Sequence, residues 1–225
     1  MSTPHNEAME ALNRPVSRLL VPGLVLVVLA CALGVWILMR GPEPFILDDW
    51  WNQALLGWQV EALVVFSQAM NWLGGGVVGV FVVPIGGALL LVLMRRYMGA
   101  LYFVAASIVS AGAVQVLKQL FGRARPDEIL IISDYGSFPS GHAANAATIA
   151  VVAAVLFPRV WVVVVGAVWI VLMGFSRTYL HAHWLSDTVG GAMVGAGMAL
   201  VVASAFAVQL RAEASRRAAR IAVPA

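Results

Sequence analysis

Six separate apolar runs dominate this sequence, and each has about the length needed to cross a lipid bilayer, roughly 17–25 residues. Hydrophobic residues make up 61% of the chain and charged residues only 11%, far from the balance of a soluble globular domain. We therefore predict an all-α fold, an integral membrane bundle of six transmembrane helices. The predicted spans are Leu19–Met39, Gly74–Met94, Met98–Leu117, Gly141–Phe157, Val160–Phe175 and Thr188–Leu210.

The first apolar run is predicted to be a retained transmembrane helix and not a cleaved signal peptide. Glu7 and Glu10 precede it, it is about 21 residues long, and no small-residue cleavage site follows it. The single cysteine, Cys31, excludes an internal disulfide framework. We divide the chain into a cytoplasmic N-terminal segment (1–18), a six-helix membrane domain (19–210) and a basic cytoplasmic tail (211–225).

A tryptophan-rich stretch, residues 44–72, separates the first two apolar runs. Trp50, Trp51, Trp58 and Trp72 are spread along it, and tryptophan favours the membrane–water interface. We predict an amphipathic helix lying on the outer surface of the membrane. The alternative interpretation is a seventh, weakly apolar span.

The distribution of basic residues predicts how the chain is oriented in the membrane. With six spans, the two termini and two short loops share one side, which carries most of the arginines, and the other side carries most of the acids. Because basic loops stay in the cytoplasm, we predict a multi-pass protein of the cell inner (plasma) membrane with both termini cytoplasmic. The arginines on the cytoplasmic side are Arg14, Arg18, Arg95, Arg96, Arg159, Arg211, Arg216, Arg217 and Arg220.

The first of three polar clusters on the predicted outer side is KQLFGRARP, in which Lys118 and Arg125 are seven residues apart. That spacing places both cations on one face of a helix if the third span continues this far. Pro126 predicts a helix end at this point. A basic pair at the end of a membrane helix is, by itself, often just an interfacial anchor.

The second cluster is GSFPSGHAANA, which predicts a turn followed by a helix. Ser140 is a candidate N-cap residue, and the backbone N–H groups at the start of a helix form an anion-binding site. His142 lies in the first turn of this helix. In isolation, this pattern is equally typical of a capped membrane helix with an interfacial histidine.

The third cluster is SRTYLHAHWLSD. His183 and Asp187 are four residues apart, so a helix would bring them to the same face, where the carboxylate can orient the imidazole and leave its other nitrogen free to attack. Arg177 precedes them, and its guanidinium can bind an oxyanion with two N–H groups. His181 is predicted to be an interfacial or packing histidine.

Taken together, the three clusters place three cations on one side of the membrane, and such a group requires an anion. The sequence resembles the type 2 phosphatidic acid phosphatase (PAP2) superfamily, whose pattern is KX6RP, then PSGH, then SRX5HX3D. Here Lys118 begins the first motif, Pro139 to His142 form the second, and Ser176 to Asp187 form the third, with every spacing met. The motifs cover about seventy residues directly.

The resemblance implies a phosphatase that works through a phosphohistidine, without a metal or other cofactor. His183 would be the nucleophile, Asp187 its orienting partner and His142 the general acid. The phosphoryl group would be bound by Lys118, Arg125, Ser140, Gly141 and Arg177. The sequence itself has no paired carboxylates for magnesium, no zinc ligand set and no phosphate-binding glycine loop.

The predicted substrate is a lipid phosphate or diphosphate in the bilayer, with undecaprenyl diphosphate favoured and phosphatidylglycerophosphate second. We expect no nucleic-acid partner, and the sequence does not determine the oligomeric state. Two alternatives stay open: a phosphotransferase of the same fold that uses a second lipid as acceptor, and a non-enzymatic anion-binding or transport protein. The outer-loop residues Asp127, Glu128, Asp134 and Tyr135 receive no role from the sequence.

Overall fold

The computed structural model describes residues 4–222, and within this range the chain is helical with no β-strand. Nine α-helices and one π-helical segment follow each other along the chain. They are α1 (Pro4–Arg40), α2 (Ile46–Leu56), α3 (Glu61–Gly74), η1 (Val78–Val82), α4 (Val83–Leu93), α5 (Tyr97–Phe121), α6 (Gly141–Leu156), α7 (Val160–Tyr179), α8 (Leu185–Ala205) and α9 (Ala207–Ala222).

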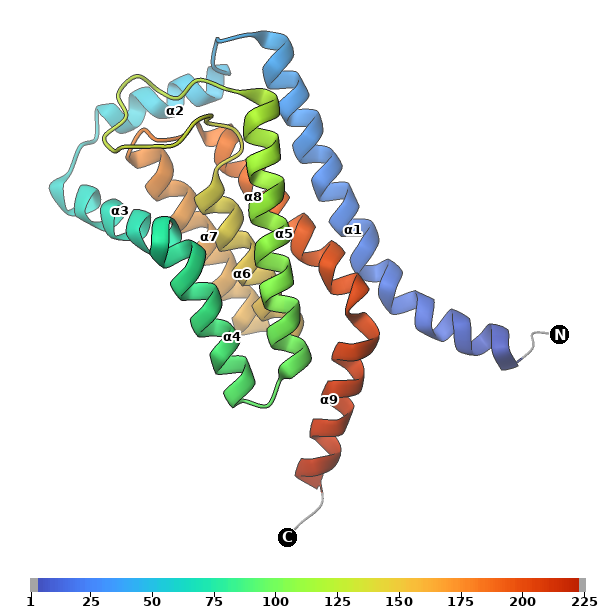
Figure 1. The fold of residues 1–225 in the computed structure, drawn as a ribbon. Coiled ribbons are helices and arrows are strands. Elements are labelled where there is room, and N and C mark those ends of the chain that lie inside the picture. Colours follow the sequence, from blue (N-terminus) through green and yellow to red (C-terminus); the bar gives the residue numbers. More distant parts are fainter. Residues whose placement is uncertain (1–3, 223–225) are drawn as a thin grey trace.

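Helix α8 lies at the centre of the bundle, where it packs against α1, α5 and α6 (Figure 1). Small residues allow this close packing, as is common between membrane helices. A Cβ atom on Gly195 of α8 would overlap the backbone of Ala144 of α6, and one on Gly197 would lie 2.9 Å from the carbonyl oxygen of Gly23 in α1. Glycine at these two positions therefore lets α8 lie close to α6 and to α1.

Four helical segments are long and apolar enough to cross a membrane: Val16–Arg40, Tyr97–Phe121, Val160–Tyr179 and Leu185–Ala205. Glu61–Gly74 and Val78–Leu93 meet at an angle of 47° and together have the length of a fifth span, broken in the middle. Helix α6 is apolar but shorter. The chain is a membrane protein, and the count of six spans stays a prediction.

Residues 44–72 contain two helices, α2 and part of α3, where the sequence predicted one. Helix α2 is held against the end of α7: the indole of Trp51 donates to Thr178 Oγ1 at 3.0 Å. The backbone N–H of Val60 donates to the hydroxyl of Tyr179 at 2.7 Å. The interfacial position of α2 stays a prediction.

The end of α5 differs from the sequence-based prediction. The helix stops at Phe121 because Gly122 adopts a left-handed conformation (φ +51°), a common helix C-terminus. Arg125 therefore lies in the loop that follows, and the prediction that helical spacing aligns it with Lys118 is wrong. The two cations meet because the loop folds back over the helix end.

The bundle has two distinct ends (Figure 1). The long loop between α5 and α6, residues 122–140, lies beside α2 at one end. The α4–α5 turn and the C-terminal helix α9 lie toward the other end. Glu213 of α9 accepts hydrogen bonds from the N–H groups of Met98 and Gly99, at 2.8 and 3.3 Å, and so caps the start of α5.

Candidate active site

The predicted site residues converge at the end of the bundle that carries the 122–140 loop. A cavity of about 620 Å³ is lined by the C-terminal end of α3, by η1, by the C-terminal part of α5, by the N-terminal half of α6 and by the loop itself, together with Arg177 of α7 and His183 before α8. Five of the eight predicted residues line it: Lys118, Gly141, His142, Arg177 and His183. Arg125, Asp187 and Ser140 lie next to it, in contact with these residues or their neighbours.

Lys118 and Arg125 converge on one carboxylate. Lys118 Nζ lies 2.9 Å from both oxygens of Asp134, and Arg125 Nη2 lies 2.9 Å from Asp134 Oδ1. Both cations also donate to the carbonyl oxygen of Gly136, at 3.1 and 2.9 Å. Backbone hydrogen bonds to Gly136 therefore help to hold both cations in place.

Arg177 supplies the third cation and is almost completely buried. Its Nη1 donates to Asn71 Oδ1 at 2.7 Å. The Nε–H groups of both Arg125 and Arg177 are buried without a hydrogen-bond partner among the described residues. Because a buried donor without a partner is costly, these two N–H groups are available to an acceptor that enters the site.

The hydrogen-bond partners of His183 assign its tautomer. Its Nε2 lies 3.2 Å from Arg125 Nη1, and a guanidinium can only donate. Nε2 must therefore be the unprotonated, accepting nitrogen, and the proton lies on Nδ1. The pKa of His183 is lowered to about 4, mainly because burial disfavours the charged ring and with help from Arg125 and Arg177, although Asp187 opposes the shift.

His183 Nδ1 faces Asp187 Oδ2 across 3.7 Å, which is longer than a hydrogen bond. The two side chains thus lie close together, as expected, but they do not form a hydrogen bond in the structure. Their proximity does not come from one helical face, because His183 precedes α8 and Trp184 is the N-cap residue. Nδ1 has no hydrogen-bond partner within the described chain.

Asp187 is held by partners that the sequence analysis did not identify. Its Oδ1 accepts from Arg123 Nη1 at 2.6 Å, and its Oδ2 accepts from Ser137 Oγ and from the backbone N–H of Trp184 at 2.9 Å. Arg123 also binds Asp48 of α2 at 2.8 Å. Arg123 was visible in the first cluster, but nothing in the sequence pairs it with an acid 75 residues away.

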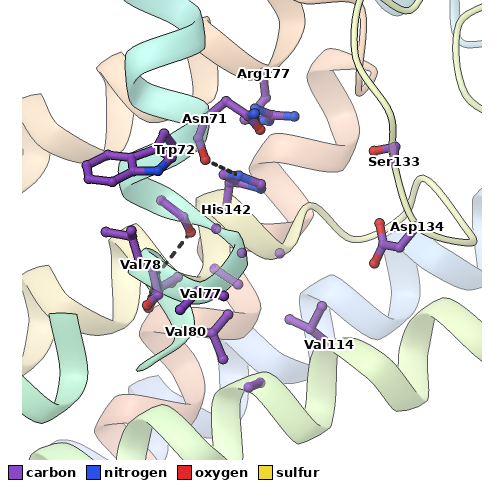
Figure 2. Close-up of a pocket in the computed structure, with 18 of the residues that line it drawn as sticks. Asn71, Trp72, Val77, Val78, Val80, Val114, Ser133, Asp134, His142 and Arg177 are labelled. Carbon is purple, nitrogen blue, oxygen red and sulfur yellow. Dashed lines mark hydrogen bonds between the residues drawn. The ribbon is translucent and has the colours of Figure 1, made fainter. Parts of the chain in front are cut away.

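His142 is held in place by Asn71, a residue that lies outside the three sequence motifs. Its Nε2 lies 3.0 Å from the backbone oxygen of Asn71, whose side chain binds Arg177 (Figure 2). Ser140 is the N-cap residue of α6 and accepts from the N–H of Ala143 at 3.5 Å. Asn71 therefore links His142, the candidate acid, to Arg177, a candidate phosphate-binding cation. No pattern in the sequence indicated it.

His181 lies outside the cavity. It is buried, and its Nδ1 lies 2.7 Å from Asn52 Oδ1 of α2, while its Nε2 lies 3.2 Å from Gln59 Nε2. These contacts agree with the packing role predicted for it. Within residues 4–222, no group of three or more His, Cys, Asp or Glu side chains is arranged to hold a metal ion.

The cavity extends from the polar site along α5 toward the middle of the bundle. Its lining continues from Lys118 past Val114 and Ser110 to Ser107, eleven residues or about 16 Å of helix at 1.5 Å per residue. Val77, Val78 and Val80 of the bent segment face it from the other side (Figure 2). The site is therefore the polar end of a partly apolar groove between helices.

Comparison with known proteins gives a consistent result. A family model described as "PAP2 superfamily" matches residues 97–211. The lipid A 1-phosphatase of Rhizobium johnstonii is 34% identical over 117 residues, which is 45% of this chain and 46% of that protein. Phosphatidylglycerophosphatase B of Bacillus subtilis is 35% identical over 91 residues, 36% of this chain and 45% of the relative.

A third relative, the undecaprenyl-diphosphatase of Sulfolobus acidocaldarius, is 32% identical over 120 residues, 50% of this chain and 57% of that protein. The matches thus span about half the length of these relatives. In fold, the chain is similar to the PAP2-type phosphatidylglycerolphosphate phosphatase of Bacillus subtilis. The TM-score is 0.65 at 24% identity, over 80% of this chain and 93% of the other.

Proposed function

Because the chain belongs to the PAP2 superfamily, we propose that it is a membrane phosphatase that removes a phosphate from a lipid phosphate or diphosphate through a phosphohistidine intermediate. One observation carries this proposal above the others. His183, whose accepting Nε2 lies 3.2 Å from Arg125 Nη1, lines a cavity that Lys118 and Arg177 also line. Anion binding alone requires no such nucleophile.

The first step transfers the phosphoryl group to the enzyme. His183 Nε2 attacks phosphorus, the bond from phosphorus to the lipid oxygen breaks, and the leaving oxygen takes a proton from His142. Lys118, Arg125 and Arg177 bind the equatorial oxygens, where charge must be neutralised in phosphoryl transfer. A well-placed general acid typically contributes about 10²–10⁴ in rate.

The second step releases inorganic phosphate. A water molecule gives a proton to His142 and attacks phosphorus, and the P–N bond to His183 breaks. Asp187 stabilises the positive charge that the ring carries while it is phosphorylated. Its partners Arg123 and Ser137 hold the carboxylate in place through both steps.

The groove along α5 supports a substrate with an apolar chain. The phosphate would lie at the polar end, and the chain would follow the valines of η1 and α5. The three relatives are named for three different lipid phosphates. We favour undecaprenyl diphosphate, with phosphatidylglycerophosphate second, and we include lipid A in the test.

We also propose that the site faces the outside of the inner membrane and that both termini are cytoplasmic. The arginines of the α4–α5 turn and of α9 support this orientation. An outward site would act on lipid carriers and lipid head groups that are exposed on the outer leaflet.

The test is phosphate release from the three lipids by purified protein in detergent with EDTA, with His183→Ala beside the wild type. We expect release that survives EDTA and that falls by at least about 10⁴-fold in the variant, because the nucleophile is lost. His181→Asn is the matched control: its side chain keeps hydrogen-bonding groups and tolerates the positive φ (+51°) of this position. It should retain the wild-type kcat.

Equal release by His183→Ala would contradict the mechanism. Absence of release from all three lipids by the wild type would contradict the hydrolase. A phosphorylated product that forms only with an added acceptor lipid would identify a phosphotransferase instead.

A further inference from the structure

A carboxylate outside the three motifs lies inside the phosphate-binding group. Asp134, on the 122–140 loop, accepts from Lys118 through both of its oxygens and from Arg125 through Oδ1, each at 2.9 Å. In Figure 2 it lies at the loop side of the cavity, across from His142 and Arg177. Two of the three cations that the mechanism needs are therefore already donating to an internal anion.

Both cations have hydrogen-bond partners besides Asp134. Lys118 also donates to the carbonyl oxygen of Gly136, and Arg125 donates to the carbonyl oxygens of Gly136 and Ala182. The Lys118 side chain is only 3% exposed, whereas that of Asp134 is 56% exposed. The carboxylate is thus the partner that can move into solvent while the cations stay.

Asp134 is charged at neutral pH. Partial burial opposes its ionisation, but the hydrogen bond from Lys118 and the charges of Lys118 and Arg125 outweigh this effect and hold its pKa below the ordinary value. The oxygens of a phosphoryl group accept from the same kind of N–H donors as a carboxylate does. Asp134 and a bound phosphate would therefore compete for Lys118 and Arg125.

We propose that Asp134 is an internal competitor of the phosphoryl group, which is displaced when substrate binds and returns to displace inorganic phosphate after hydrolysis. The proposal rests on the proposed phosphatase function. The site can bind phosphate only in the fraction of molecules in which Asp134 has left the two cations, and the apparent affinity is reduced by that fraction. The affinity for free phosphate is therefore lowered. A lipid phosphate regains the lost affinity through contacts of its chain with the groove.

The test compares the wild type with Asp134→Asn, which keeps the shape of the side chain and removes its charge. We expect inorganic phosphate to inhibit Asp134→Asn on the order of tenfold more strongly, because a charge-assisted competitor has been removed. The control is Asp127→Asn in the same loop. The Asp127 side chain is exposed and forms no hydrogen bond or ion pair with the described residues, so its inhibition constant should not change.

A purely structural role for Asp134 predicts the opposite sign. If the carboxylate only positions the cations, Asp134→Asn will bind phosphate more weakly or equally, and either result overturns the proposal. Asp134→Glu is a second variant that restores a carboxylate, and its inhibition constant should return toward that of the wild type. Product release should also slow in Asp134→Asn, so that kcat falls together with KM.

The two proposals can fail separately. Calorimetric titration of inorganic phosphate into the purified proteins measures the competition without turnover. If the wild type hydrolyses no lipid phosphate, the phosphatase proposal fails, while a tighter dissociation constant for Asp134→Asn would still support the competition. If the wild type is active and the dissociation constant is unchanged in Asp134→Asn, only the competition is overturned.

Discussion

Arg123 connects two buried carboxylates that come from distant parts of the chain. It lies 2.8 Å from Asp48 of α2 and 2.6 Å from Asp187 of α8, and all three side chains are nearly inaccessible to solvent. A carboxylate buried beside His183 is stable as an anion only if it is paired. In the proposed mechanism, Arg123 would therefore act through Asp187, as a positioning residue.

We predict that Arg123→Lys lowers kcat by about tenfold, a loss of roughly 1.4 kcal/mol of transition-state stabilisation, with little change in KM. A lysine has one compact ammonium and cannot reproduce the forked contacts to both acids. Asp48→Asn is the comparison, because it leaves the bond between Arg123 and Asp187 in place, and its kcat should fall less. Steady-state kinetics on the lipid substrate measures both variants.

If Arg123→Lys instead raised KM by about tenfold and left kcat unchanged, the positioning role would be contradicted. Arg123→Ala is a less informative variant, because removing one member of a buried ion pair costs about 3–5 kcal/mol of stability. Its effect on activity would be mixed with unfolding.

At the scale of single residues, the sequence predicted the charged groups of the site but not the residues that hold them. Lys118, His142, Arg177 and His183 stand in recognisable patterns and line one cavity. Asn71 and Asp134 contact these residues, and Arg123 contacts Asp187. No sequence pattern indicates a role in the site for any of the three. Their roles depend on contacts between distant segments, which spacing along the chain does not encode.

The break between α3 and α4 shapes one wall of the cavity, which residues 74–80 line. The two halves meet at 47°, and the π-helical segment η1 begins just after the break. Asn145 of α6 donates to the carbonyl oxygens of Gly74 and Gly79, at 3.2 and 2.9 Å, so it satisfies backbone groups that the broken helix leaves free. The bend thereby brings Asn71 and Gly75 against His142.

We predict that Gly75→Ala lowers kcat, because a Cβ atom at this position would overlap the imidazole ring of His142. A shift of about 1 Å in a catalytic group can cost roughly 10²-fold in rate. Gly86→Ala in α4 is the matched control, since a Cβ there meets nothing within 4 Å. It should leave kcat unchanged and stabilise the helix by roughly 0.5–1 kcal/mol.

Kinetics and thermal unfolding of the two variants, side by side, provide the check. Equal loss of activity in both would attribute the effect to the helix as a whole and contradict a specific contact with His142.

At the scale of elements, apolar length predicted where helices run, and local chemistry decided where they end. Helix α5 stops at Gly122 before Pro126 is reached. The last predicted span, Thr188–Leu210, is divided at Phe206 into α8 and α9. The break between α3 and α4 falls where the second predicted span, Gly74–Met94, begins. The 47° bend at this break was not predicted, because hydropathy carries no information about the direction of a helix axis.

Across the whole molecule, the basic side chains at the two ends of the bundle have different kinds of partner. At the cavity end, the cations meet carboxylates or a candidate anion site. At the other end, arginines contact the C-terminal carbonyl groups of helices: Arg96 donates to Leu156 of α6 at 2.8 Å, and Arg217 donates to Met94 after α4. These carbonyl groups carry the negative end of the helix dipole.

This asymmetry leads to a prediction about orientation in the membrane. In a background in which Cys31 is replaced by Ser, Asp127→Cys places a single thiol on the 122–140 loop, and Ser215→Cys places one on α9; both positions are exposed. We expect a membrane-impermeant maleimide to label Asp127→Cys in bacterial cells whose inner membrane is intact. Ser215→Cys should react only after lysis, because arginine-rich segments stay in the cytoplasm.

Labelling after lysis shows that both thiols are reactive and so serves as the control for each variant. Labelling of Ser215→Cys in intact cells would contradict the predicted orientation. It would also place the cavity on the cytoplasmic side, where the available substrates are lipid phosphates of the inner leaflet. An outward Asp127→Cys would instead restrict the substrate to lipids whose phosphate reaches the outer leaflet, and it would favour undecaprenyl diphosphate over lipids that are dephosphorylated inside the cell.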